Sequence, residues 1–298
     1  MELAELINLS KEKPLDELLK IVEQKITSVP DYQISMWENF TAPVLYRARK
    51  HSHLEGNINQ ENGLYRFESE SEFWNAPPEF SPLGRCQNKG ESLLYCSTSW
   101  ETAISEVRPI TGDFVSVSIY HAKRLPDNPN VFFGSRIVPI GVQYLSQIEH
   151  LKHMFKDYNF EERNLEFYEL DTFLDDLFHA DVTEDEQHIY KLSIAVTRCM
   201  MKNLFDGVVE RQMHGIIYSS MARGKTNYNF VLRPTHARSI YTLNHVQTFQ
   251  ILEATENLIK LQLMRNGEIF GEKYPPLDFF EMVWFNVDDI VIDEISKK

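Results

Sequence analysis

Residues 80–120 read FSPLGRCQNKGESLLYCSTSWETAISEVRPITGDFVSVSIY. Arg85 follows a glycine in a predicted turn, and Tyr95 lies ten positions later in a short apolar run that is typical of a strand. Glu106 comes eleven positions after Tyr95, near the end of a predicted helix. The stretch therefore predicts a small pocket assembled from a turn, a strand and a helix that are close in sequence.

The helix of this stretch is expected at about residues 99–108. Thr98 followed by Glu101 has the spacing of a capping box, and Pro109 fits just beyond the helix end. One helical face is apolar and comprises Trp100, Ala103, Ile104 and Val107. Glu106 then lies at the border of the apolar face, where a carboxylate can line a cleft. The alternative is a solvated helix glutamate in a chain with 44 acidic residues.

Length and charge limit the classes of function. A chain of 298 residues with 43% hydrophobic residues can bury a substantial core in one or two domains. The net charge of −14 repels phosphate backbones, so we expect no nucleic acid as a partner. The basic cluster at residues 46–50, YRARK, is either a site for one small anion or a solvated strand end.

Cysteine usage and hydropathy predict a cytoplasmic protein. Cys86, Cys96 and Cys199 are scattered, which favours neither a disulfide framework nor a zinc site. Glu2 and Glu5 stand where a secretory signal needs positive charge, and no apolar run approaches the length of a membrane span. We therefore expect no membrane partner and no metal.

The pattern along the chain predicts an α+β fold in three parts. Residues 1–40 are expected to form a helical extension, in which Leu18, Val22 and Ile26 share one face. Residues 41–233 mix short strands with helices and contain a helical insertion at about 146–205, where Thr183 and Glu186 cap a helix. Residues 234–298 are expected to be a β extension with a type I′ hairpin at Arg265-Asn266-Gly267-Glu268.

Two further motifs are rejected on spacing. Gly224-Lys225-Thr226 resembles the end of a phosphate-binding loop, but serine stands where that loop needs its first glycine. His179 lies near further His and Asp residues, yet their spacing fits neither a zinc helix motif nor a calcium loop. We interpret that segment as a solvated acidic face.

Four segments, taken in order, resemble the RES domain family, which is named for an Arg, a Glu and a Ser and includes bacterial toxins that destroy NAD. They are LYRAR at 45–49, APPEFSPLGR at 76–85, LLYCSTSWETAISEVRP at 93–109 and GIIYSS at 215–220. The resemblance runs from about residue 45 to 232. It implies a fold like that of ADP-ribosyltransferases, in which small antiparallel sheets with flanking helices hold NAD in a cleft.

The resemblance also implies roles for particular residues. Arg47 and Arg85 would bind the NAD diphosphate, since guanidinium groups hold such oxygens bidentately, and Arg49 would support them. Tyr95 and Glu106 would form the central pair. Ser220 would be the late serine and donate one further hydrogen bond.

Two positions depart from the family pattern or leave it open. After Gly-Arg the family usually has a small or aromatic residue and then asparagine, whereas this chain has Cys86-Gln87. Either Asn227 or Asn229 matches the asparagine before the family's last strand.

The resemblance implies an enzyme that breaks the nicotinamide–ribose bond of NAD, with NAD as substrate and no other cofactor. Breaking this bond passes through an oxocarbenium-like state, which a carboxylate such as Glu106 stabilises. Water or phosphate would accept the ADP-ribose, which makes a toxin that depletes cellular NAD. Such toxins are blocked by an antitoxin or immunity protein. The alternatives are transfer of ADP-ribose to a macromolecule, or a catalytically silent module that binds a nucleotide or a partner.

Overall fold

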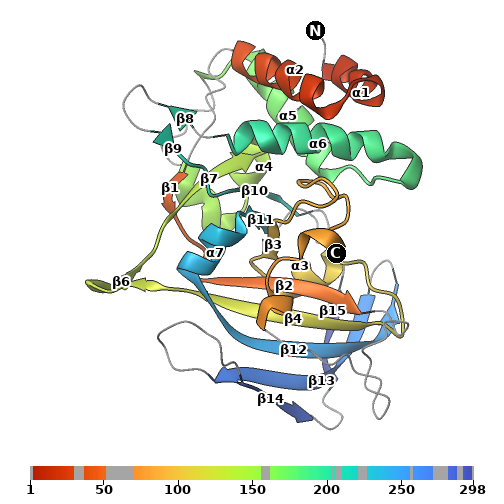
Figure 1. Ribbon diagram of the computed structural model, residues 1–298, viewed down its shortest axis with the longest axis vertical. Coiled ribbons are helices and arrows are strands. Elements are labelled where there is room, and N and C mark those ends of the chain that lie inside the picture. The colour runs from red at the N-terminus through yellow and green to blue at the C-terminus, as the bar shows by residue number, and fades with distance from the viewer. Residues whose placement is uncertain are drawn as a thin grey trace.

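One large mixed sheet runs through the protein, and helices lie against it (Figure 1). The computed structural model describes residues 3–29, 37–51, 70–155, 162–202, 204–205, 210–220, 227–255, 258–270, 281–286 and 291–296. The predicted α+β class is confirmed. The Gly224-Lys225-Thr226 motif, which was rejected as a phosphate-binding loop, lies outside the described residues.

The sheet has eleven strands in the order β1-β7-β10-β11-β3-β2-β4-β12-β13-β14, and β15 also pairs with β13. The strands of its first half are β1 (Trp37–Phe40), β7 (Ser135–Ile140), β10 (Gly215–Ser219), β11 (Tyr228–Leu232) and β3 (Leu94–Ser97). Those of its second half are β2 (Val44–His51), β4 (Phe114–Ala122), β12 (Tyr241–Ala254), β13 (Leu258–Phe270), β14 (Glu281–Asn286) and β15 (Val291–Ser296). Two small hairpins are β5 (Arg124–Leu125) with β6 (Asn128–Phe132), and β8 (Leu204–Phe205) with β9 (Glu210–Arg211).

The two halves of the sheet meet at a narrow joint. Tyr46 of β2 pairs with Ser97 of β3, and among the described residues this is the single register pair between the halves. Within each half the pairing is long, as in β2 against β4, where eight residues are in register. The β7–β10 pair is parallel, which makes the first half mixed.

The helices are α1 (Leu3–Glu12), α2 (Leu15–Ser28), α3 (Trp100–Glu106), α4 (Val142–Leu145), α5 (Leu165–His179), α6 (Gln187–Met200) and α7 (Pro234–Ile240). Short 3-10 turns are η1 (Glu70–Phe73), η2 (Pro78–Phe80), η3 (Glu149–Phe155) and η5 (Glu184–Glu186). Figure 1 shows α1, α2 and α6 lying together above the first half of the sheet. No helix in the described part of the chain combines the length and the apolar composition that a membrane crossing requires.

Two apolar cores follow from the sequence patterns. The larger core joins α1, α2, α5 and α6 to the first half of the sheet, and the predicted face of α2, with Leu18, Val22 and Ile26, is buried in it. The smaller core lies between α3 and the second half, where Ile104 packs with alternate residues of β4 such as Val117. Because successive strand side chains point to opposite faces, this alternation fixes the face that α3 covers.

The two predicted helix starts can be compared with the structure. Ser99 caps α3, since its Oγ accepts from the N–H of Thr102 at 3.3 Å, so the prediction that Thr98 caps this helix is wrong by one residue. The capping box of Thr183 and Glu186 is confirmed, and it begins η5 just before α6.

The predicted hairpin at Asn266-Gly267 is wrong. Both residues lie within β13, where they pair with β12 on one side and with β14 on the other. The chain instead reverses between Ala254 and Leu258. Pairing on both sides therefore outweighs the turn preference of Asn-Gly at this position.

Candidate functional site

A cavity of about 690 Å³ opens where the ends of α3, α5 and β10 come together. The turn between β12 and β13 contributes Ala254 and Thr255 to one wall. Glu106 and Arg85 line this cavity. It therefore contains two of the residues predicted for the pocket, together with a wall from beyond the segment that resembles the RES family.

Glu106 is the last residue of α3, and its exposed carboxylate is oriented by two donors. Ser220 Oγ donates to Glu106 Oε1 at 2.6 Å, and Asn229 Nδ2 donates to the same oxygen at 2.7 Å. Ser97 Oγ in turn donates to Asn229 Oδ1, which fixes the orientation of the amide. Both of these hydrogen bonds end on Oε1, and no donor to Oε2 is found among the described residues of this cavity wall.

These contacts bring together the predicted glutamate and serine, which are 114 positions apart. They also separate the two asparagines that the sequence left open. The side chain of Asn229 reaches Glu106, whereas Asn227 contributes its backbone carbonyl to the N–H of Ser220 at 2.8 Å.

Arg85 lies in the cavity wall and is held against the C-terminal end of α5. Its Nη1 donates to the carbonyl of Leu177 at 3.2 Å, and its Nη2 donates to the carbonyl of Ala180 at 3.0 Å. A guanidinium suits this position, because the last carbonyls of a helix lack helical partners and carry partial negative charge. The result is a fixed positive charge in the same cavity as the Glu106 carboxylate.

Tyr95 stabilises the turn that carries Arg85. Its hydroxyl accepts from the N–H of Cys86 at 2.9 Å. Gln87, which replaces the asparagine of the family pattern, is buried: its Nε2 donates to Ser81 Oγ at 2.6 Å and its Oε1 accepts from the N–H of Leu93 at 2.9 Å. The altered turn therefore has its own complete set of hydrogen bonds.

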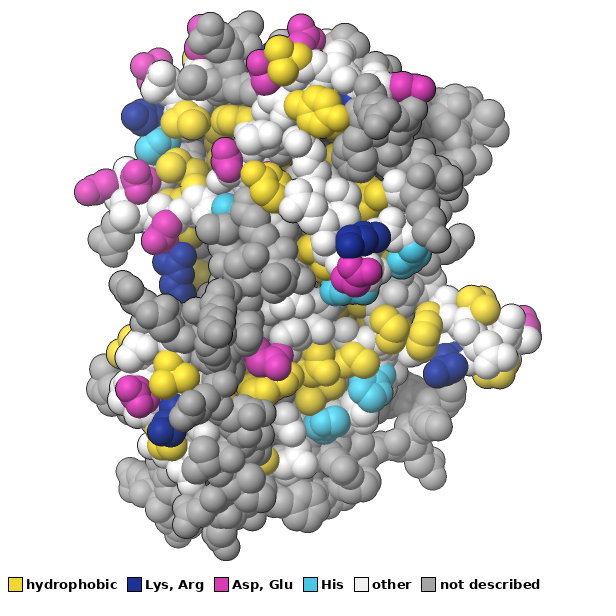
Figure 2. Space-filling model, turned by 180° about the vertical axis from the view of Figure 1, so that it is seen from behind, with side chains coloured by type: hydrophobic (Ala, Val, Ile, Leu, Met, Phe, Trp, Pro, Cys, Tyr) yellow, Lys and Arg dark blue, Asp and Glu magenta, His cyan; other side chains and the backbone are white. Residues whose placement is uncertain are grey.

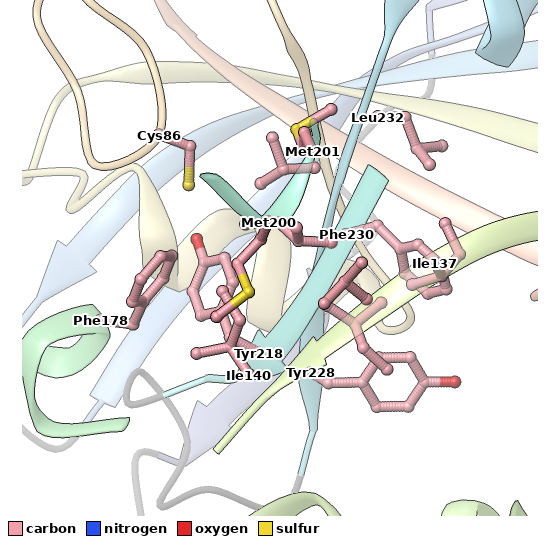
Figure 3. Close-up of a cluster of buried hydrophobic side chains, with 14 of the residues drawn as sticks. Cys86, Ile137, Ile140, Phe178, Met200, Met201, Tyr218, Tyr228, Phe230 and Leu232 are labelled. Carbon is pink, nitrogen blue, oxygen red and sulfur yellow. The ribbon is translucent and has the colours of Figure 1, made fainter. Parts of the chain in front are cut away.

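The Cys86 thiol is not a nucleophile candidate. Burial raises the pKa of Cys86 to about 11, so the thiol stays protonated at neutral pH. Figure 3 shows Cys86 in the apolar cluster near Phe178 and Tyr218, whose ring centroids are 5.2 Å apart. Burial also raises the pKa of the Tyr218 hydroxyl well above its usual range.

Arg47 and Arg49 lie outside the lining of this cavity. Because Tyr46 pairs with Ser97, the alternation of β2 places Arg47 and Arg49 on the sheet face opposite to Ser97. Arg47 Nη1 donates to the carbonyl of Phe73 at 3.5 Å, and Arg49 Nη1 lies 3.7 Å from a carboxylate oxygen of Glu72. Burial lowers the pKa of the Arg47 guanidinium. The structure thus brings Arg85, Glu106 and Ser220 together at the cavity and places the two β2 arginines with η1.

Asp175, His179 and Ser219 form a second network, in which His179 and Ser219 line the cavity and Asp175 is buried behind them. Neither Asp175 nor Ser219 was predicted from the sequence as a site residue, and the interpretation of His179 as part of a solvated face did not anticipate these contacts. His179 Nδ1 lies 3.0 Å from Asp175 Oδ2, and His179 Nε2 lies 3.0 Å from Ser219 Oγ and 2.6 Å from the Ser219 carbonyl. Ser219 Oγ donates to Asp175 Oδ1 at 3.0 Å. A sequence signal existed: Asp171, Asp175 and His179 recur every four residues, which places them along one side of α5.

Arg108 lies at the cavity mouth in an unusual backbone conformation. Its φ is 46°, in the left-handed region, and Pro109 follows it. Arg108 Nη1 donates to Asp181 Oδ1 at 2.8 Å, and 70% and 78% of the two side chains are exposed. This ion pair connects the segments that follow α3 and α5.

Charge on the rest of the surface is mixed. On the face that Figure 2 shows, the described Lys and Arg side chains stand apart from one another among acidic and apolar ones. No group of three or more His, Cys, Asp and Glu side chains in the described residues is gathered as a bound metal ion requires. No protein-family model matches the sequence, and no curated protein matches it either.

Proposed function

We propose that this protein is an enzyme that consumes NAD by breaking the bond between nicotinamide and ribose. The observation that carries the proposal is the Glu106 carboxylate, which Ser220 and Asn229 orient in a cavity that also contains the Arg85 guanidinium. The resemblance of the surrounding segments to the RES domain family supplies the substrate class. NAD is the substrate, and the proposal needs no other cofactor.

The residue types suit the reaction. When the C–N bond breaks, its electron pair leaves with nicotinamide and positive charge develops on the ribose. A carboxylate that is already oriented stabilises this charge without reorganisation, which is the role we propose for Glu106. The two donors on Oε1 fix the group in place, and among the described residues they leave Oε2 without a donor. An oxygen of the acceptor then forms the new bond to the ribose carbon. Water releases one proton to solvent in this step, whereas a deprotonated oxygen of phosphate has none to release.

Arg85 supplies the positive potential that the substrate requires. Its guanidinium is held by two backbone carbonyls, and no ion pair joins it to a carboxylate of the described residues. The diphosphate of NAD carries two negative charges, which such a fixed cation attracts in a partly enclosed site. Tyr95 acts on the same group indirectly, since it holds the N–H of Cys86.

The arrangement of the sheet supports a likeness to ADP-ribosyltransferases. Two groups of strands meet at the Tyr46–Ser97 pair, and Ser97 is also the residue that orients Asn229 and hence Glu106. A site at the meeting of two sheets is what the resemblance implies for NAD binding. We infer that NAD binds in the cavity that Glu106 lines, which Ser97 and Asn229 connect to this joint.

Transfer of ADP-ribose to a macromolecule is the second candidate. Ile110 supports it, because this residue lines the cavity while 62% of its surface is exposed, which provides an apolar rim for an acceptor. Under either reaction, loss of cellular NAD or modification of an essential molecule would make the protein a toxin. An antitoxin or immunity protein that covers the cavity mouth would block it.

The test is release of nicotinamide from NAD by the purified protein, with and without phosphate. Glu106→Gln is the variant, and Glu101→Gln on the same helix is the control. Turnover by the parent and the control but not by Glu106→Gln is expected, and the products ADP-ribose or its 1-phosphate identify the acceptor. Turnover only with a cell lysate would favour macromolecular transfer. Calorimetric binding of NAD without any turnover would instead support a silent binding module.

A further inference from the structure

The network of Asp175, His179 and Ser219 has the distances of a serine nucleophile with its base, but its hydrogen atoms are placed differently. The Ser219 carbonyl, 2.6 Å from His179 Nε2, can only accept, so Nε2 carries a proton. Ser219 Oγ lies 3.0 Å from Asp175 Oδ1 and donates to it. No unprotonated ring nitrogen is then directed at Ser219 Oγ, and the serine has no base.

The contact between His179 Nδ1 and Asp175 Oδ2 requires a second proton. His179 Nδ1 lies 3.0 Å from Asp175 Oδ2, and both groups are almost fully buried. A neutral ring with its proton on Nε2 would set a lone pair of Nδ1 against the carboxylate, so one more proton lies between the two groups. With that proton the printed contacts are mutually consistent: Asp175 accepts from Ser219 Oγ and from His179 Nδ1, and Nε2 donates to the carbonyl and hydroxyl of Ser219.

The network of Asp175, His179 and Ser219 holds the end of a strand. β10 ends at Ser219, and the next residue, Ser220, donates to Glu106. The Ser220 N–H is held from the β11 side by the Asn227 carbonyl at 2.8 Å. His179 and Asp175 hold the same strand end from the α5 side, through the carbonyl and the hydroxyl of Ser219.

A glycine makes room for the buried carboxylate. At Gly141, just before α4, an added Cβ would lie 2.4 Å from Asp175 Oδ1, and φ is 70°. Both the conformation and the close approach require glycine there. Asp171, one turn earlier on α5, accepts from the N–H groups of Val142 and Gln143 and fixes the same junction.

We propose that Asp175 and His179 are positioning residues that clamp the end of β10 through Ser219 and thereby set Ser220 against Glu106. The catalytic consequence rests on the proposed function, whereas the geometric consequence does not. If the clamp is lost, Ser220 moves away from Glu106 while the NAD-binding groups stay in place. We therefore expect a loss in kcat rather than a rise in KM.

The geometric test is a crystal structure of His179→Ala. The proposal expects the Ser220 Oγ to Glu106 Oε1 distance to increase beyond hydrogen-bonding range, and an unchanged contact would overturn it. His179→Gln keeps a donor near the Nε2 position, so it should preserve the contact better than alanine does. If the alanine variant does not fold, the same distance is measured in Asp175→Asn.

The second test reads the protons directly. Nitrogen NMR of protein with ¹⁵N-labelled histidine, with His179 assigned from the His179→Gln spectrum, is expected to show protons on both ring nitrogens or a strongly downfield Nδ1 proton shared with Asp175. An unprotonated Nε2 would overturn the clamp and indicate a base for Ser219. This measurement gives its answer whether or not the protein acts on NAD.

The kinetic test separates the clamp from the proposed function. In Asp175→Asn, nicotinamide release should fall about a hundredfold in kcat, as for a reacting group displaced by about 1 Å, with KM for NAD little changed. Asp176→Asn, an exposed neighbour on α5, is the matched control and should behave like the parent. Equal kcat in Asp175→Asn and the parent would overturn the clamp. A parent without turnover would reject the proposed function alone, and the distance and the NMR spectrum would still decide on the clamp.

Discussion

Ser219 and Ser220 are neighbours in the chain, but their hydroxyls serve two carboxylates in opposite situations. Ser220 donates to Glu106, which is exposed and lines the cavity. Ser219 donates to Asp175, which is fully buried and also bonded to His179. A carboxylate that faces solvent can stabilise charge on a ligand, whereas a buried one that is saturated with donors can only hold its neighbours. Burial, rather than residue type, thus separates the proposed reacting group, Glu106, from the proposed positioning group, Asp175.

The largest expected effect comes from removing the charge of the open carboxylate. Glu106→Gln should lower nicotinamide release about 10³-fold, because the neutral amide cannot stabilise positive charge on the ribose. The melting temperature should change little, since the side chain is exposed. The rate and the melting curve of Glu101→Gln provide the reference, and a variant at position 106 that keeps full turnover would contradict the assignment.

Among changes around the buried Asp175 carboxylate, we expect the substitution of Gly141 to cost the most stability. Gly141→Ala sets a Cβ against Asp175 Oδ1 and also strains the backbone, so we expect the free energy of unfolding to fall by about 3 kcal/mol or more in urea titrations.

Gly112→Ala is the matched control for that experiment. Gly112 has φ of 94°, but an added Cβ there meets no atom within 4 Å. Its loss of stability should reflect backbone strain alone, about 1 kcal/mol. Equal losses in the two variants would show that the contact with Asp175 is unimportant.

Replacing Ser219 and Ser220 by alanine, one at a time, should distinguish the roles of their two hydrogen-bond networks. Ser220→Ala removes one of the two donors that orient Glu106, and we expect turnover to fall about tenfold or more. Ser219→Ala keeps its backbone carbonyl and the contact with His179, so its main effect should be about 1 kcal/mol of stability. Steady-state kinetics and urea unfolding of both variants measure this difference. A larger loss of turnover in Ser219→Ala than in Ser220→Ala would refute it.

Acid should weaken the fold through histidines outside both networks. His214 and His236 stack with ring centroids 3.5 Å apart, and burial together with neighbouring positive charge lowers the pKa of each to about 4. Between pH 4 and their ordinary pKa of 6.5 the unfolded chain binds more protons than the folded chain, so stability falls as the pH falls through this range.

The melting temperature should therefore drop between pH 7 and pH 5, and His236→Gln should reduce the drop. An equal drop in that variant would show that other groups cause it. This measurement sharpens the comparison of Glu106 with Asp175, because it separates the effect of acid on the stability of the fold from its effect on groups at the cavity.

The smallest effect is expected at the cavity mouth. The Arg108–Asp181 ion pair is mostly exposed, so Arg108→Ala should change the free energy of unfolding by less than about 1 kcal/mol. A larger loss would indicate that this ion pair does more than connect two surface segments. Urea titrations at low and high salt measure it.

The sequence predicted elements whose signals are local. The α3 helix, the buried face of α2 and the capping box of Thr183 and Glu186 all follow from spacing within one or two helical turns. At Asn266-Gly267 the pairing between strands determined the conformation. These residues are part of a strand because β12 and β14 pair with them on both sides. Ser99 rather than Thr98 caps α3, a difference of one residue that spacing alone does not settle.

At the candidate site, the resemblance placed Glu106 and Ser220 in one pocket, and the structure brings them into contact. Local patterns could not have paired residues so distant in the chain. His179 was interpreted as part of a solvated face because its sequence neighbours are acidic, yet its partners are Asp175, one turn earlier, and Ser219 on a strand. The side of α5 that is buried depends on packing, which the sequence does not display.

The Tyr46–Ser97 pair has a mechanical consequence. A sheet resists a pulling force through its ladder of hydrogen bonds, and along this line the described ladder is one pair long. Under load from optical tweezers attached to the two half-sheets, we expect the molecule to part there first. Glu106 on α3 would then be separated from Asn229 and Ser97, which stay paired with each other in the first half. The proposed activity would be lost at a lower force than the fold.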